Sequence, residues 1–122
     1  MDAERKVLLV EDEALVAALA VDALEELGYQ AIEATTAKAA MAIAAGATPL
    51  LFAIVDVGLP DGRGDALAIE LRKLRAELPI IIATGYAELP PDAAYDFLRL
   101  DKPYTQEQLS EMIGIAAHGE PR

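Results

Sequence analysis

Carboxylates follow two apolar segments of the chain, at the point where each segment ends. Residues 50–55 are apolar without a break, and Asp56 follows them directly. Residues 7–10 are also apolar, and Glu11 and Asp12 come next. A buried carboxylate is costly unless a cation or hydrogen bonds compensate it. If the two segments are neighbouring parallel strands, three carboxylates meet at one edge of a sheet, and the sequence predicts a cation among them.

Two more segments end on side chains that can hold phosphate oxygens. Residues 80–84 end on Thr84, and residues 97–102 end on Lys102. An aspartate can accept a phosphoryl group as a covalent aspartyl phosphate. Because the carboxylate and the phosphate are both anionic, this reaction depends on electrostatic screening. We therefore interpret Asp56 as a phosphoacceptor, with the Lys102 ammonium and the Thr84 hydroxyl each contacting a phosphoryl oxygen.

The acidic residues also predict the identity of the cation. Mg²⁺ prefers oxygen ligands, takes one or two carboxylates and keeps several waters. The carboxylates of Asp12 and Asp56 are the natural ligands, and the backbone carbonyl of Gly58 could add a third. Glu11 would hold a coordinated water. The sequence thus predicts a Mg²⁺ site built from Glu11, Asp12, Asp56 and Gly58.

The segments between the strands have helical patterns. Apolar residues recur at three- and four-residue spacing over residues 14–27, from Leu15 through Leu19 and Leu24 to Leu27. Further helices are expected at residues 37–45, at 65–77 with Leu67, Leu71, Leu74 and Leu78 inward, and from the Thr105/Gln108 capping box to about residue 118. An edge strand is expected at residues 30–34, and two prolines confine any helix of the fourth crossover to about residues 91–96.

Alternating strands and helices predict a parallel sheet built from βα units. With right-handed crossovers they give a flavodoxin-like (βα)5 three-layer sandwich with strand order 2-1-3-4-5. Ligands of such sheets bind at the carboxyl ends of the strands where the order reverses, between the first and third strands. The acidic residues fall at that point.

Composition limits the class of protein. The 122 residues are enough for one domain, which we expect to span residues 1–122. The net charge of −11 argues against nucleic acid as a partner, since phosphate repels such a surface. No apolar run has the length of a membrane span, the first residues do not form a secretory signal, and the absence of Cys is compatible with the expected cytoplasmic location.

The strand-end residues and the turns beside them form one set: Val10-Glu11-Asp12, Asp56 with Pro60 and Gly62 to Gly64, Thr84, and Lys102-Pro103. This set resembles the receiver domain of two-component response regulators, and the resemblance covers essentially the whole chain. It implies that Asp56 takes phosphate from a sensor histidine kinase or a phosphotransfer protein, with Mg²⁺ at Glu11 and Asp12. It also implies a conformational switch that regulates a downstream protein. Such a domain is a signalling phosphoacceptor that catalyses only its own phosphorylation and dephosphorylation, and it often has a cis bond at its Lys-Pro pair.

The residues around Thr84 resemble one receiver subfamily. Ala83-Thr84-Gly85-Tyr86 is similar to the Phe-Ala-Thr-Gly-x-Tyr motif of stand-alone regulators common in alphaproteobacteria. Partners in that group are often kinases of the HWE type. The match is incomplete, because Ile82 replaces the Phe and no residue separates Gly85 from Tyr86.

A second departure concerns the switch. Arg99 stands where receivers commonly have an aromatic residue on the last strand, and a guanidinium cannot fill an apolar space without a partner. We therefore expect Thr84 to pull the Gly85-Tyr86 turn, with Gly85 as the hinge. Residues 86–96, expected to be the most mobile part, would then cover or uncover the face that carries Arg99.

Two alternatives remain open from the sequence. A phosphatase of the haloacid dehalogenase type also combines Asp, Thr and Lys, but it needs a second Asp two residues after the nucleophile, where this chain has Gly58. A degenerate receiver that binds proteins without phosphate would use the same fold. Its site residues would not be needed, whereas all of them are present here.

Overall fold

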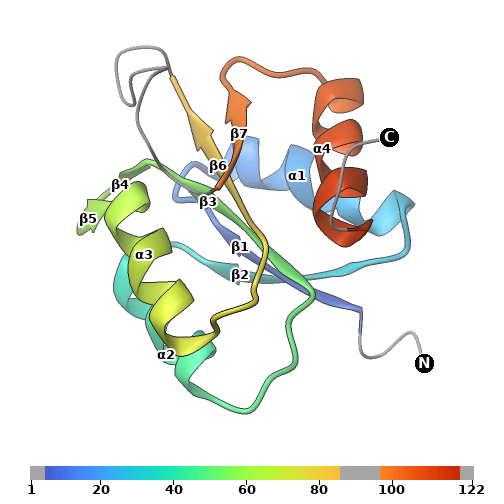
Figure 1. The fold of residues 1–122 in the computed structure, drawn as a ribbon. Helices are drawn as coiled ribbons and strands as arrows, with labels where there is room; N and C mark the ends of the chain where they lie inside the picture. The colour runs from blue at the N-terminus through green and yellow to red at the C-terminus, as the bar shows by residue number, and fades with distance from the viewer. Residues whose placement is uncertain (1–4, 86–96, 119–122) are drawn as a thin grey trace.

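Five parallel strands form one sheet in the order β2-β1-β3-β6-β7. The computed structural model of the protein describes residues 5–85 and 97–118 (Figure 1). The strands are β1 (Lys6–Val10), β2 (Gln30–Ala34), β3 (Phe52–Asp56), β6 (Ile80–Thr84) and β7 (Leu98–Asp101). Because β6 and β7 are the fourth and fifth strands expected from the sequence, the predicted order 2-1-3-4-5 is confirmed.

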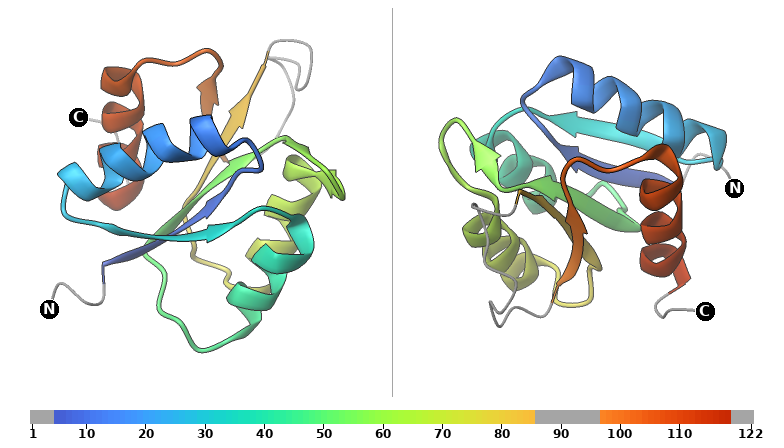
Figure 2. Two further views of the ribbon diagram at one scale, coloured as in Figure 1. Left: turned by 180° about the vertical axis from the view of Figure 1, so that it is seen from behind. Right: turned by 90° about the horizontal axis from the view of Figure 1, so that it is seen from above.

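Helices cover both faces of this sheet (Figures 1 and 2). On one face α1 (Ala14–Glu26) and α4 (Gln106–His118) share an apolar core with Leu9, Phe52 and Ile54. On the other face α2 (Ala37–Ala45) and α3 (Gly64–Leu74) share a second core with Leu8 and Val55. These three layers confirm the flavodoxin-like fold. The described residues contain four helices, and the short helix expected near residues 91–96 lies outside them.

The helix ends follow from the local sequence. Gly28 has a φ of +90°, which glycine adopts without strain, and its N–H donates to the Glu25 carbonyl. The Tyr29 N–H donates to the Leu24 carbonyl, so α1 ends in a complete Schellman motif. The expected capping box also forms before α4: the backbone N–H groups of Thr105 and Gln108 each donate to the other residue's side chain, at 3.0 Å.

Of the four leucines whose spacing predicts α1, Leu24 alone is buried. Leu15 is 78% exposed and Leu19 is 49% exposed, and Leu27 is exposed as well. The buried residues of α1 are Ala17, Ala20, Ala23 and Leu24. Small side chains let the helix lie close to the sheet, so the alanine stripe faces inward and most of the larger leucines lie outside it.

The third predicted helix also needs correction. Leu67, Leu71 and Leu78 are buried as expected, but Leu74 is 47% exposed. Leu74 is the last residue of α3 and lies at the edge of the buried face. None of the described helices has both the length and the apolar character needed to cross a membrane.

We expect Gly114→Ala to stabilise the domain by about 0.5–1 kcal/mol, because glycine is a poor helix former. Gly114 lies inside α4, and a Cβ built there meets nothing within 4 Å. Urea unfolding of both proteins at the same pH measures the difference. A lower midpoint for the alanine variant would contradict the packing of α4 described above.

Candidate functional site

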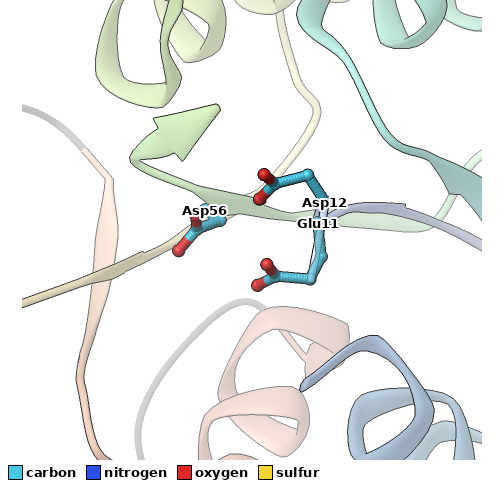
Figure 3. Close-up of side chains that lie close together, drawn as sticks. All are labelled: Glu11, Asp12 and Asp56. Atoms are coloured by element: carbon cyan, nitrogen blue, oxygen red, sulfur yellow. The ribbon is translucent and has the colours of Figure 1, made fainter. Parts of the chain in front are cut away.

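The candidate site residues gather at the carboxyl edge of the sheet. Glu11 follows β1, Asp56 ends β3, Thr84 ends β6, and Lys102 follows β7. Carboxylate oxygens of Glu11, Asp12 and Asp56 lie within 4.8 Å of one another. Figure 3 shows the Glu11 and Asp12 carboxylates directed toward the side on which Asp56 lies. The parallel pairing of β1 with β3 is what brings these three side chains together.

Both oxygens of the buried Asp56 carboxylate have partners. The Lys102 ammonium lies 2.6 Å from Oδ1, and the Gly58 N–H donates to Oδ2 at 3.1 Å. Asp56 is only 4% exposed, so its charge is removed from most of the solvent. The ammonium and the backbone donor stabilise the ionised form of this carboxylate, which is the form that can act as a nucleophile.

Glu11 is also buried, but within residues 5–85 and 97–118 no ammonium pairs with it. Its pKa is raised from the ordinary value of 4.5 to about 7, chiefly by burial and further by the nearby Asp56 charge. The Glu13 N–H, which donates to Glu11 Oε2 at 3.0 Å, opposes this rise. A divalent cation among the three carboxylates would compensate the repulsion and favour ionised Glu11.

Thr84 lies on the next strand, close to the acidic cluster along the sheet edge. Asp56 is opposite Ala83 in the pairing of β3 with β6, so Thr84 is one residue further toward this edge. Its side chain is fully buried, and the hydroxyl donates to the Gly85 carbonyl at 3.0 Å. The hydroxyl is therefore engaged with the following turn. Tyr86, the next residue of the expected switch, lies outside the described residues.

Arg99 lies on β7 and marks the face that the expected switch would cover or uncover. Leu98 and Leu100 pack with the core under α1 and α4, whereas Phe97 packs with the other core, so successive side chains alternate between the two faces of the sheet. The Arg99 guanidinium pairs with Asp101 at 2.7 Å, and about a quarter of its side chain is exposed. A carboxylate on its own strand thus helps compensate the partial burial of the guanidinium.

The segment after Asp56 forms a hairpin. Strands β4 (Gly58–Leu59) and β5 (Gly62–Arg63) pair antiparallel and lead directly into α3. Gly64 then passes very close to the strand: a Cβ at this position would lie 2.0 Å from the Asp56 carbonyl oxygen. Only glycine permits this approach, and it lets the Gly64 N–H donate to the Val57 carbonyl at 2.8 Å.

Sequence reasoning also missed Tyr104. Its pKa is raised by burial and then by the charges of Glu11 and Asp56, so the phenol is within electrostatic reach of the acidic cluster. Its body packs with the core under α1 and α4. An aromatic residue two positions after Lys102 was the available signal. The Lys102-Pro103 peptide bond is cis, as expected.

These contacts define what the site can do. Three clustered carboxylates offer hard oxygen ligands of the kind that Mg²⁺ prefers. The Lys102 ammonium and the Thr84 hydroxyl can donate hydrogen bonds to an oxyanion. The combination favours chemistry in which a carboxylate and a phosphate approach each other.

Comparison with known proteins agrees with this chemistry. The family model described as "Response regulator receiver domain" matches residues 7–114. The sensor kinase CckA of Brucella abortus (strain 2308) is 37% identical over 116 residues, which cover 88% of this chain and 12% of the kinase. The photosynthetic apparatus regulatory protein RegA of Rhodobacter capsulatus is 33% identical over 89 residues, 73% of this chain and 48% of that protein.

A solved structure supports the same assignment. The CheY-like receiver domain protein of Methanospirillum hungatei JF-1 superimposes with a TM-score of 0.83 at 28% identity, over 94% of both chains. The chain spans about an eighth of the first curated relative and about half of the second. Both the sequence matches and the fold therefore show that this chain belongs to the response regulator receiver domain family of two-component signalling.

Proposed function

We propose that this receiver accepts a phosphoryl group on Asp56 from a sensor histidine kinase or a phosphotransfer protein. The observation that supports this most strongly is the position of the Asp56 carboxylate. It lies 2.6 Å from the Lys102 ammonium on one side and beside Glu11 and Asp12 on the other. A structural ion pair would need only the lysine, whereas phosphoryl transfer needs both the cation site and the ammonium.

The transfer proceeds by attack of an Asp56 carboxylate oxygen on the phosphorus of a phosphohistidine. A P–O bond forms while the P–N bond of the donor breaks, and the bonding electrons stay on the imidazole nitrogen. Lys102 shifts from the carboxylate to a phosphoryl oxygen as the negative charge moves outward. The Gly58 N–H, which already donates to Oδ2, orients the carboxylate for the attack.

Glu11, Asp12, Asp56 and the Gly58 carbonyl would hold Mg²⁺. All four are hard oxygen donors, and the raised pKa of Glu11 indicates an acidic pocket that gains from a cation. When bound, Mg²⁺ neutralises negative charge on the phosphoryl oxygens. Since a ligand that binds only the folded state stabilises it, millimolar Mg²⁺ should also raise the melting temperature.

Mg²⁺ affinity should fall as the pH falls through about 7. The folded-state pKa of Glu11, about 7, exceeds its ordinary value of 4.5, so the cation-free folded state binds the extra proton between these values. Stability of the cation-free protein therefore decreases as the pH rises across this window, while cation binding expels the proton. We expect Mg²⁺ to bind about tenfold more weakly near pH 6 than near pH 8.

Calorimetric titration at the two pH values measures this difference, and Glu11→Gln is the control. The glutamine variant should bind Mg²⁺ with little dependence on pH in this range. An affinity of the wild type that is the same at both pH values would show that Glu11 does not compete with the cation for a proton.

The switch that we propose begins at Thr84. Its hydroxyl leaves the Gly85 carbonyl and donates to a phosphoryl oxygen, which pulls the turn toward Tyr86 with Gly85 as the hinge. The motif Ala83-Thr84-Gly85-Tyr86 supports placement in the Phe-Ala-Thr-Gly-x-Tyr subfamily. We also propose that residues 1–122 form one receiver domain and that it is cytoplasmic. An HWE-type kinase would then be the phosphodonor, and a downstream protein would read the face around Arg99.

Beryllofluoride titration with Mg²⁺, followed by amide NMR, tests this function. A phosphoacceptor receiver should convert to a second set of resonances around Asp56, Thr84 and Lys102. A degenerate receiver should show no change with beryllofluoride, and a phosphatase of the haloacid dehalogenase type should turn over an added phosphate substrate catalytically. Either of these outcomes would overturn the proposal.

A further inference from the structure

A carboxylate of the β4–β5 hairpin caps a helix that is distant in sequence. The first intrahelical hydrogen bond of α2 runs from the Ala40 N–H to the Thr36 carbonyl at 3.1 Å. The three preceding N–H groups therefore need partners from outside the helix ladder. Ala37 and Lys38 donate to the two oxygens of Asp61, at 2.8 Å and 3.1 Å, and Ala39 donates to the Thr36 hydroxyl.

Asp61 belongs to the hairpin that follows Asp56. It lies in the turn between β4 and β5, and the hairpin begins at Gly58, two residues after Asp56. The Gly58 N–H holds Asp56 Oδ2, and Gly64 closes the segment back onto Val57. The Asp61 carboxylate therefore connects the N-terminus of α2 with the loop that presents Gly58.

The helix that receives this cap is also bound at its other end. Its sequence is largely alanine, its buried residues are Ala40 and Ala44, and Met41 and Ile43 pack against the same core. At its other end the Arg75 guanidinium donates to the carbonyls of Ala44 and Gly46, both at 3.1 Å. A negative group at the N-terminus and a positive group at the C-terminus both complement the helix dipole. Both come from the chain that follows β3, so α2 is tied to that part of the molecule at each end.

We propose that Asp61 is a positioning residue that fixes the Gly58 hairpin against the acidic cluster and makes α2 respond when a cation binds there. The proposal rests on the proposed role of the Gly58 carbonyl as a Mg²⁺ ligand. Loss of the two N–H donors of α2 would release the turn at Asp61 and leave the hairpin to other contacts, such as the packing of Leu59 against the core. The backbone at Gly58 would then have to be ordered as the cation binds, which weakens binding.

Mg²⁺ titrations of two variants separate positioning from simple helix capping. Asp61→Ala removes the tie between the hairpin and α2, whereas Thr36→Ala removes a cap of the same helix without touching the hairpin. At physiological salt, which screens the loss of a distant exposed charge, we expect Asp61→Ala to raise the Mg²⁺ dissociation constant about tenfold. Thr36→Ala should change it less than about twofold, although both variants lose a cap.

Amide NMR supplies the second readout. In the wild type, addition of Mg²⁺ should shift the amide resonances of Ala37 and Lys38. In Asp61→Ala, the Mg²⁺-induced shifts of the other α2 amides should be smaller than in the wild type by about half or more. Asp61→Asn, which keeps one acceptor oxygen and the side-chain size, should fall between wild type and alanine and guards against misfolding of the alanine variant.

Three results would overturn the proposal. They are wild-type Mg²⁺ affinity in Asp61→Ala, equal losses in Asp61→Ala and Thr36→Ala, or α2 amides that do not respond to Mg²⁺ in the wild type. Because the probe is Mg²⁺ alone, these results are independent of phosphorylation. A protein that passes this test but does not accept a phosphoryl group would refute the proposed function and leave the role of Asp61 intact.

Discussion

Asp56→Asn is expected to abolish phosphorylation of the protein completely. The amide cannot attack phosphorus as a carboxylate does, and no other carboxylate of the cluster combines burial with a bonded ammonium. Intact-mass measurement after incubation with acetyl phosphate and Mg²⁺ detects the added phosphoryl group. The wild type should gain the mass of one group, and the variant should gain none over the same period.

The control is Asp22→Asn, which makes the same change at an exposed carboxylate of α1. This variant should be phosphorylated at the wild-type rate. If Asp56→Asn were also modified at that rate, the phosphoacceptor would be a different residue.

Gly64→Ala is expected to cause the largest loss of stability of any single methyl addition described here. A Cβ at Gly64 would lie 2.0 Å from the Asp56 carbonyl oxygen and 2.8 Å from the Val57 Cα, both of which are backbone atoms. Backbone cannot move aside as a side-chain tip can, so β3 and the start of α3 must separate. We expect a cost of about 3 kcal/mol or more and a melting temperature lower by about 10 °C or more.

Gly62→Ala is the matched control in the same hairpin. A Cβ at Gly62 meets nothing within 4 Å, so this variant should melt within a few degrees of the wild type. Thermal unfolding monitored by circular dichroism measures both variants. Equal melting temperatures for Gly64→Ala and the wild type would mean that Gly64 does not pass close to β3 as described.

The fold could be predicted from the sequence because its central strands are buried. Residues 80–83 and 52–55 are apolar on both faces, as expected for central strands of a parallel sheet, and the polar residues Thr84 and Asp56 mark where they end. The inner face of α1 could not be predicted in the same way. Leucine spacing and alanine spacing both fit a helical period there, and the choice depends on how closely the helix approaches the sheet.

The same contrast holds within the site. Glu11, Asp12, Asp56 and Lys102 could be predicted to meet because each stands at a strand end and parallel strands share one edge. The partnership of Asp61 with α2 could not, because it joins residues more than twenty positions apart through an exposed turn. An Asp-Gly pair predicts only a turn, and the helix that the carboxylate caps is known from the tertiary structure alone.

Chemical trapping of the phosphorylated residue tests the central claim most directly. Wild-type protein is treated with acetyl phosphate and Mg²⁺, the acyl phosphate is reduced with borohydride to convert the modified aspartate to homoserine, and the peptides are sequenced by mass spectrometry. We predict homoserine at position 56 and only when Mg²⁺ is present. Homoserine at another aspartate, or none at any position, would contradict the assignment of Asp56 as the phosphoacceptor.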